Sequence, residues 1–401
     1  MENNTYKKSV VRTRPHQFRE NIRVWLKPAI FLTLFLFVFS LFVIPMGLSN
    51  ALNTMMNTAY KLLIDTTLYI MAIAVMAGAI SALFMEFGVI GLLNKLLSPL
   101  MRPLFDMPGA ASLGIVTTYL SDNPAILTLA DDMEYRQFFK AYQIPALTNL
   151  GTAFGMGLIV TTFVLGLGGY LGSQVGLAAV CGNMGAIIGG IVSTRLMLRF
   201  TAKALGKSAE AAPVQQTKET KPDDKPKKGN IMFRILDALM SGGKKGVDMG
   251  LSIIPGVLII CTVVMMLTNG PSAGGVYTGA AYEGIGLLPL AAGKLDFILN
   301  PLFGFSSGAG IAVPVTALGS AGAALGIIPT LLQSGQATSG DVAVFTAMCM
   351  CWSGYLSTHV SMMNVLKCSR FTGKAIFSHT LGGIAAGVAA HWLFILLCNL
   401  L

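Results

Sequence analysis

Long apolar runs separated by short polar turns dominate the chain and predict a series of membrane-spanning helices. A run of about 20 apolar residues is long enough to cross the hydrocarbon core of a bilayer as a helix. The pattern predicts spans at residues 29–47, 65–87, 145–169, 176–199, 248–268, 341–361 and 375–399. A shorter helix pattern over residues 90–105 is interrupted by Pro99 and Pro103. We therefore expect an all-α polytopic protein that is surrounded by the lipid bilayer.

The stretch from Ala110 to Ala130 contains two apolar runs, each too short to cross a bilayer. They are separated by a polar segment, Ser121-Asp122-Asn123-Pro124. Proline disfavours helix at the preceding residue and fits the first turn of a new helix, which Ser, Asp and Asn cap. We predict a broken, re-entrant helix hairpin over residues 108–131. Unwound backbone at membrane depth must be buried in protein or line a wet cavity, so the break marks a binding site; an ordinary surface loop is the alternative.

The second half of the chain repeats features of the first half. Ile90-Gly91-Leu92-Leu93 recurs at residues 285–288, an offset of 285 − 90 = 195, and Pro103-Leu104-Phe105 recurs at residues 301–303, an offset of 301 − 103 = 198. At the second offset the polar break lies over Gly319-Ser320-Ala321-Gly322, which predicts a second helix break, built with glycine, within residues 284–333. Interrupted segments at matching positions of two halves point to a transport site, whereas chance similarity of glycine-rich sequence is the alternative.

Two further features support the division into repeats. Asp65 and Asp248 are aligned as the starts of corresponding spans, with the glycine-rich segment 269–283 filling the difference in offset. The hydrophilic segment 201–229 has a composition that cannot bury a core, which predicts a disordered linker between the repeats, followed by an amphipathic piece at 231–240. The predicted parts are a basic N-terminus with the first span (1–61), the first repeat (62–200), a cytoplasmic linker (201–231) and the second repeat (232–401).

The distribution of Lys and Arg predicts the orientation. The N-terminus, residues 195–245 and residues 367–374 are rich in basic residues and are expected in the cytoplasm. The segments expected on the opposite side contain neither Lys nor Arg; they are 47–57, 168–176 and 269–284. With re-entrant hairpins, this bias places Met1 inside and Leu401 outside, and it makes the two repeats inverted relative to each other.

Composition excludes several classes of protein. Of the 401 residues, 54% are hydrophobic and only 11% are charged, so a soluble domain is a poor fit. The net charge of +10 lies in a few loops, which is typical of topology-setting charge and gives no reason to expect a nucleic-acid partner. The six cysteines show no paired framework, and Cys349-Met350-Cys351 is predicted to pack in the core instead of binding a soft metal. No GxSxG, HExxH, P-loop or CxxC pattern is present, so we expect neither an enzyme nor a cofactor.

Few polar or ionisable side chains fall within the apolar segments, and such residues are candidates for a solute site. The predicted substrate-binding residues are Ser121, Asp122, Asn123, Asn149, Ser306, Ser307, Ser320 and His359. The alternatives are helix capping for Asp122 and Asn123, close helix packing for the serines, and a packed, hydrogen-bonded imidazole for His359. An intramembrane Asp122 would bind a coupling ion, either Na+ or H+. No metal site is expected.

The segment from Asn94 to Gln137, with the later Phe303–Gly308 region, resembles the Gate, or nucleoside-recognition, domain membrane proteins of bacteria. The likeness covers residues 62–164 and, more faintly, 252–366. It is clearest to a permease-like branch, through Met101-Arg102-Pro103-Leu104-Phe105 and Pro108-Gly109. The resemblance implies a bacterial inner-membrane protein with a transporter-like inverted-repeat fold and a gate made of broken helices. The resemblance does not identify a substrate, because the acidic and polar motifs of nucleoside carriers and the paired cysteines of iron permeases are not recognisable in this sequence.

Three functions therefore remain open. The leading hypothesis is a transporter or permease for a small polar solute, nucleoside-like or not, that works by alternating access around the two helix breaks. The second is a non-transporting assembly or signalling partner, similar to the spore-maturation branch of the same grouping. The third is a divalent metal permease. A homo-oligomer is compatible with all three.

Overall fold

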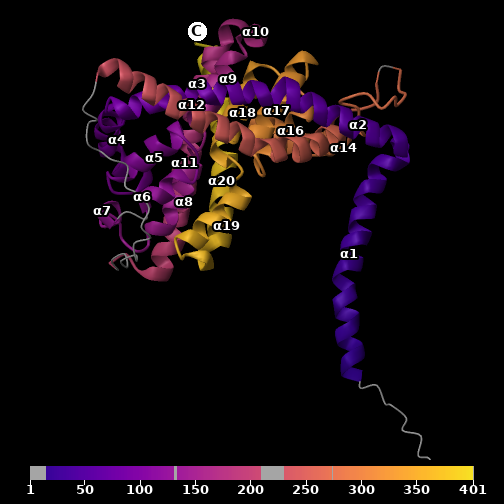
Figure 1. Cartoon of the computed structure of the whole chain (residues 1–401), viewed down its shortest axis with the longest axis horizontal. Coiled ribbons are helices and arrows are strands. Elements are labelled where there is room, and N and C mark those ends of the chain that lie inside the picture. Colours follow the sequence, from indigo (N-terminus) through magenta and orange to yellow (C-terminus); the bar gives the residue numbers. More distant parts are fainter. Residues whose placement is uncertain (1–14, 131–132, 209–229, 273, 401) are drawn as a thin grey trace, which may run out of the picture.

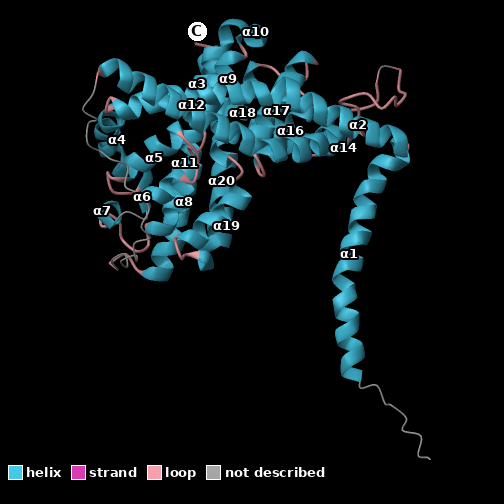
Figure 2. Ribbon diagram, in the orientation of Figure 1, coloured by secondary structure: helices cyan, strands magenta, loops and turns pink. Residues whose placement is uncertain are grey.

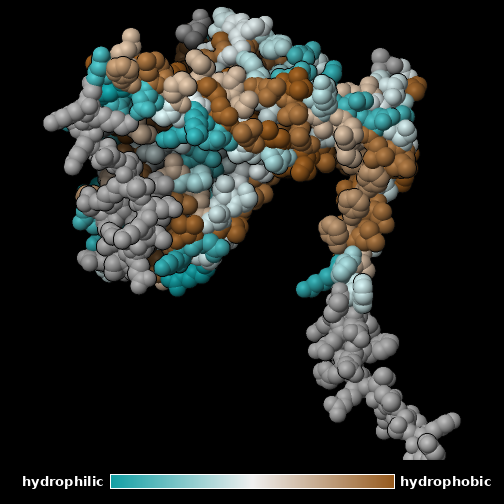
Figure 3. All heavy atoms as spheres, in the orientation of Figure 1, coloured by the Kyte–Doolittle hydropathy of each residue, from teal (hydrophilic) through white to brown (hydrophobic). Residues whose placement is uncertain are grey.

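The fold of the chain, given by a computed structural model, is helical throughout the residues it describes, which are 15–130, 133–208, 230–272 and 274–400 (Figures 1 and 2). In those ranges six helices are long and apolar enough to cross a membrane, or seven if a bent pair is counted as one span. The protein is therefore a multi-pass membrane protein. The first helix, α1 (Pro15–Met46), stands apart from the body (Figure 1), and exposed hydrophobic side chains cover the part of it nearest the body (Figure 3).

The first repeat begins with one continuous helix and ends with another. Its elements are α2 (Leu48–Lys61), a π-helical turn (Leu62–Thr67), α3 (Leu68–Glu86), α4 (Val89–Phe105), α5 (Ala111–Leu120), α6 (Ala125–Ala130), α7 (Met133–Arg136), α8 (Ile144–Thr152), α9 (Gly157–Gly166), α10 (Gly168–Leu171), a 3-10 turn (Gly172–Gln174) and α11 (Val175–Leu205).

The second repeat has a similar order of elements. They are α12 (Ile231–Gly256), a π-helical turn (Val257–Cys261), α13 (Thr262–Thr268), α14 (Leu287–Lys294), α15 (Asp296–Phe303), a 3-10 turn (Gly308–Ile311), α16 (Ala312–Ala317), α17 (Ala321–Gln333), α18 (Ser339–Trp352), α19 (Tyr355–Val365), a 3-10 turn (Ser369–Phe371) and α20 (Thr372–Cys398). The order differs in that two helices, α14 and α15, stand where the first repeat has α4.

From Gly88 onward, the backbone confirms the internal repeat at an offset of 198. Left-handed backbone recurs at Gly88 and Gly286, an offset of 286 − 88 = 198. It recurs at Asp106 and Gly304, with φ 57° and 59°, again 304 − 106 = 198. It also recurs at the starts of α9 and α19, where 354 − 156 = 198. Helix ends that need a rare conformation therefore fall at equivalent places in both halves.

Equivalent helices of the two repeats run antiparallel, so the repeats are inverted. Along α3 and α12, Gly78 faces Gly242, whereas Met71 faces Gly250, and each approach is so close that a Cβ on the glycine would meet the neighbouring helix. The same register brings Arg234 Nε to 2.7 Å from Glu86 Oε1 at the far end of the pair. In α11 and α20 the register also runs in opposite directions, since Gly185 approaches the Ala386 carbonyl and Gly189 the Gly382 carbonyl.

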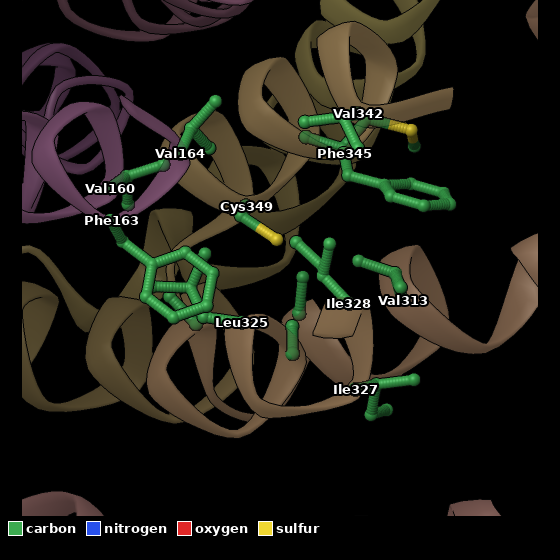
Figure 4. Close-up of a cluster of buried hydrophobic side chains, with 14 of the residues drawn as sticks. Val160, Phe163, Val164, Val313, Leu325, Ile327, Ile328, Val342, Phe345 and Cys349 are labelled. Carbon is green, nitrogen blue, oxygen red and sulfur yellow. The ribbon is translucent and has the colours of Figure 1, made fainter. Parts of the chain in front are cut away.

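The main core lies where α9, α17 and α18 meet. Figure 4 shows Phe163 from α9, Leu325 and Ile328 from α17, and Phe345 and Cys349 from α18 gathered in one cluster. The Cys349-Met350-Cys351 segment is fully buried in α18, which confirms the prediction that it packs in the core. This core ties the second hairpin to the first repeat.

The loop between α13 and α14 is held by a polar face of α2, so the glycine-rich insert is an ordered part of the fold. Asn50 Nδ2 donates to the Tyr277 carbonyl at 3.0 Å. Within the loop, the Glu283 carboxylate accepts hydrogen bonds from the hydroxyl of Ser272 and from the hydroxyl and backbone N–H of Thr278. Burial alone would raise the pKa of Glu283, but these hydrogen bonds stabilise the ionised form and lower the pKa to about 2.

Helix α4 differs from the interrupted pattern that the sequence predicts. It continues from Val89 to Phe105 with Pro99 and Pro103 inside it. Each proline removes one helical N–H donor. The carbonyls of Pro103 and Leu104 accept hydrogen bonds from the Arg195 guanidinium, so a side chain of α11 provides donors for two carbonyls in the last turn of α4.

Both long helices extend farther than predicted. Residues 48–57, expected in an outer loop, belong to α2, and the separate pieces predicted at 231–240 and 248–268 form the continuous helix Ile231–Thr268. Asp65 and Asp248 therefore lie inside helices and do not begin spans. The equivalent features are the two π-helical turns, which start at an offset of 257 − 62 = 195. Gly242 and Gly246, which lie between the two predicted pieces, serve close packing of α12 against α3.

The predicted linker begins too early in the sequence. Thr201 is fully buried in the last turns of α11, and its hydroxyl bonds to the carbonyls of Met197 and Leu198. Residues 209–229, the remainder of that prediction, lie outside the described part of the chain.

Candidate functional site

Four helix breaks meet in the interior and form the candidate site, which we call the break crossing. Two are the predicted breaks, at residues 121–124 and 318–320. The other two interrupt the predicted spans 145–169 and 341–361, at residues 153–156 and 353–354, so that neither span is one continuous helix. Hydropathy carries no sign of these interruptions, because the residues on both sides of each break are apolar.

Direct contacts join the breaks. Asn123 Nδ2 donates to the Ser353 carbonyl at 2.7 Å. The Gly354 N–H donates to the Ala317 carbonyl at 2.9 Å, at the end of α16. The fourth break is therefore hydrogen-bonded to both predicted breaks, which satisfies backbone groups that a helix end would leave unpaired.

Asn123 is the central side chain of the break crossing. It is 1% exposed, and a Cβ at Gly155 would lie only 1.4 Å from Asn123 Oδ1, so the amide occupies space that only glycine leaves open. Among the described residues, Asn123 Oδ1 and Ser353 Oγ have no hydrogen-bond partner although both are buried. A buried acceptor and a buried hydroxyl without partners are costly unless another molecule completes them.

The neighbouring predicted residues have local roles in the first break. Ser121 is exposed and ends α5, where its N–H donates to the Thr118 carbonyl at 3.2 Å. Asp122 is partly buried, and its Oδ1 accepts the Asn123 N–H at 2.7 Å. The carboxylate therefore holds Asn123 in place, which agrees with the capping alternative.

The serines of the second half separate into two places. Ser320 caps α17 at the second break, where its Oγ accepts the Ala323 N–H at 3.2 Å. Ser306 lies elsewhere, at the buried carboxylate of Asp341, to which its N–H donates at 2.9 Å. Ser307 Oγ donates to the Gln336 carbonyl at 2.8 Å. Ser306 and Ser307 thus attach the hairpin to the start of α18 and the loop before it. They precede the second break by ten or more residues, so they do not belong to it.

Asn149 and His359 belong to a second group of buried polar residues, which we call the histidine cluster: Asn149, Ser193, Tyr355, His359 and His379. Asn149 Nδ2 donates to Ser193 Oγ at 2.9 Å, and Ser193 Oγ lies 2.7 Å from His379 Nδ1. The rings of His359 and His379 have centroids 4.6 Å apart. Tyr355 follows directly after the fourth break and packs against both imidazoles, so the cluster is continuous with the break crossing.

The two histidines differ in their hydrogen bonding. His379 is bonded through both ring nitrogens, to Ser193 and, at 2.6 Å, to the Cys351 carbonyl. His359 is fully buried, and within the described residues neither of its ring nitrogens has a partner. His379 is therefore structural, whereas the polar groups of His359 remain available.

The sequence contained one overlooked signal for the third and fourth breaks. Phe154-Gly155-Met156 lies over Trp352-Ser353-Gly354 at the offset of 198, so each break has an aromatic residue, then a small residue, then a residue with left-handed backbone.

Within the described residues, no group of three or more His, Cys, Asp or Glu side chains could hold a metal ion. Besides the Asp122 carboxylate, the polar side chains of the break crossing are amides and hydroxyls, which suit an uncharged polar solute.

Comparisons with known proteins identify the fold. No protein-family model and no curated protein matches the chain. The solved structure of the concentrative nucleoside transporter CNTnw in an inward-facing substrate-bound state is similar, with 15% identity, a TM-score of 0.53, and coverage of 81% of this chain and 74% of that chain. Two structures of CNTnw variants in outward-facing states have TM-scores of 0.53 and 0.52 at 16% and 15% identity, and each covers 82% of this chain and 76% of that chain. The chain therefore has a nucleoside-transporter-like fold.

Proposed function

We propose that the protein is a transporter or permease for a small polar solute, which binds at the break crossing. The observation that carries this proposal is the buried Asn123 amide, held against Gly155 and the Ser353 carbonyl with its Oδ1 unpartnered among the described residues. A solute with N–H or O–H donors, such as a nucleoside-like molecule, would complete Asn123 Oδ1 and Ser353 Oγ.

The fold supports a mechanism of alternating access. Two inverted repeats can exchange conformations with each other. One arrangement then opens the central site to one side of the membrane, and the exchanged arrangement opens it to the other side. The similar transporter CNTnw has been solved in inward-facing and outward-facing states. For this chain we place the protein in the bacterial inner membrane, as a member of the permease-like branch of Gate-domain proteins, with its basic N-terminus in the cytoplasm.

Asp122 is the proposed site of the coupling ion, either Na+ or H+. Its carboxylate adjoins the central amide through the Asn123 N–H. We expect Asp122→Asn to fold normally, because asparagine accepts the same hydrogen bond, but to lose ion-driven accumulation of the solute. Accumulation at the parental level would show that Asp122 only orders the break.

The test is uptake by proteoliposomes with a panel of labelled nucleosides, nucleobases, amino acids and divalent cations. The expected result is uptake of a polar organic solute, strongly reduced in Asn123→Ala. Uptake should be unchanged in the control Asn53→Ala, which removes an exposed amide on α2, outside the break crossing. If no member of the panel is transported and none shifts the thermal stability, the proposal is overturned in favour of an assembly partner. Uptake of divalent cations alone would favour a metal permease.

A further inference from the structure

A polar pocket separate from the break crossing lies beside the π-helical turn of the first repeat. Its volume is about 350 Å³, near the lower limit for small-molecule sites. We call it the tyrosine pocket, after the residues that carry the argument: Lys61, Asp65, Tyr69, Tyr170, Tyr282 and Gln333. These come from the helix Leu48–Glu86, from α10, from the loop before α14 and from the end of α17, so the pocket joins both repeats.

Two opposite charges face this pocket without neutralising each other. Lys61 and Asp65 both line it, and both are exposed. Within the described residues the one ion pair joins Arg234 to Glu86, so neither pocket charge is paired with another side chain. Lys61 Nζ instead lies 6.0 Å from the centre of the Tyr282 ring. Ionisable residues within a membrane-spanning helix are costly and are usually retained for function.

The fold itself does not require these charges. The second repeat builds the same π-helical turn at an offset of 195, where Lys61, Asp65 and Tyr69 correspond to Gly256, Ile260 and Val264. The residues in and beside the first turn are therefore charged and aromatic, whereas the corresponding ones of the second repeat are uncharged and apolar. A π-helical turn is rare and occurs frequently at functional sites, where it turns side chains toward a ligand. Here Lys61 comes just before the turn, Asp65 lies within it and Tyr69 follows it, and the spacing of four residues brings all three to the same pocket.

Aromatic rings and a hydrogen bond between repeats form the walls. Tyr69 packs edge-on against Phe163 with ring centroids 6.1 Å apart. Tyr170 OH accepts a hydrogen bond of 2.8 Å from Gln333 Nε2, which joins α10 to α17. Tyr282 has left-handed backbone, φ 66°, and its N–H donates to Thr58 Oγ1 at 2.8 Å, so its ring is held over the pocket. Burial, with the negative charge of Asp65, raises the pKa of Tyr282 to about 12, so its hydroxyl stays neutral.

We infer that the tyrosine pocket binds a small aromatic zwitterion of the size of an amino acid. The ligand's carboxylate would bind the Lys61 ammonium, its ammonium would bind the Asp65 carboxylate, and its ring would pack against Tyr69 and Tyr282. A ligand of one charge would leave the other side chain unpaired, which is why both signs are needed. Because the pocket walls belong to both repeats, the bound ligand would stabilise the conformation described here. This inference is independent of transport at the break crossing.

The experiment is isothermal titration calorimetry on the purified full-length protein in detergent, with L-phenylalanine as the probe. Phenethylamine lacks the carboxylate and 3-phenylpropionate lacks the ammonium, and we expect each to bind at least about tenfold more weakly than phenylalanine. Lys61→Met and Asp65→Asn should each weaken phenylalanine binding by about tenfold or more. The control variants are Lys244→Met and Asp248→Asn, an exposed pair with the same spacing on α12, which should bind like the parent.

Three outcomes would overturn the inference. They are the absence of phenylalanine binding, equal binding of phenylalanine and its two singly charged analogues, and unchanged affinity in folded Lys61→Met and Asp65→Asn variants. If those variants do not fold, the comparison of the three ligands on the parent protein decides the question. Failure of solute uptake through the break crossing would leave the result unaffected, so the two proposals can fail separately.

Discussion

The substitution Gly155→Ala tests the geometry of the break crossing most directly. The added Cβ would lie 1.4 Å from Asn123 Oδ1 and 3.2 Å from Ser353 Oγ. A non-bonded carbon and oxygen must be more than about 3 Å apart, so the Asn123 amide must move by more than about 1 Å. That movement breaks the 2.7 Å hydrogen bond from Asn123 Nδ2 to the Ser353 carbonyl. Overpacking and a buried unpaired donor together should cost about 3 kcal/mol in the free energy of unfolding.

The same geometry predicts a strong coupling between the two residues. In an Asn123→Ala background the amide is gone, so Gly155→Ala should then cost less than about 1 kcal/mol. The coupling free energy should therefore be about 2 kcal/mol. A measurement of this size distinguishes the proposed contact from a general sensitivity of the turn to substitution.

The assay is reversible unfolding in mixed micelles at increasing dodecyl sulfate, followed by the fluorescence of the three tryptophans, of which Trp352 adjoins the fourth break. Gly91→Ala is the matched control, because a Cβ at that helical position meets nothing within 4 Å. The reasoning is refuted if Gly155→Ala is as stable as the control, or if its cost is the same with and without the Asn123 side chain.

Three other substitutions test other parts of the structure. Gly242→Ala should destabilise the protein by about 2 kcal/mol, because its Cβ would lie 2.3 Å from the backbone of α3. Gly243→Ala is the control, because its Cβ would meet only a side-chain methyl, at 3.5 Å. This control should unfold at the same dodecyl sulfate concentration as the parent. His379→Phe should cost about 2 kcal/mol more than His359→Phe in the same titration, since only the His379 nitrogens have partners among the described residues; equal costs would contradict the assignment. The stabilisation from ionised Glu283, present above pH about 4.5, should be lost as the pH falls toward about 2, so Glu283→Gln should flatten the decline of the thermal midpoint in acid; an unchanged decline would exclude this role.

The sequence by itself determined the helical fold, its inverted repeats and the first break. Apolar length fixes membrane spans because every backbone group in lipid must be bonded within its own helix. Pro124 and the capping residues before it fix the first break locally, so the position of Asn123 could be predicted without knowledge of its neighbours. The offset of 198 was readable because helix ends that need glycine or left-handed backbone recur in both halves.

Only the tertiary structure decided which residues share a site. Ser306 and Ser307 are polar and lie in the second hairpin, yet the fold places them at the start of α18 and the loop before it. Gly155 and Ser353, by contrast, fall in spans that were predicted to be continuous, and both lie against Asn123. Gly242 and Gly246 lie between two pieces that the sequence predicted to be separate, but they pack one continuous helix against α3. The physical reason is that a small residue has the same local meaning in a turn and in a close helix contact, and only the neighbouring helix distinguishes the two.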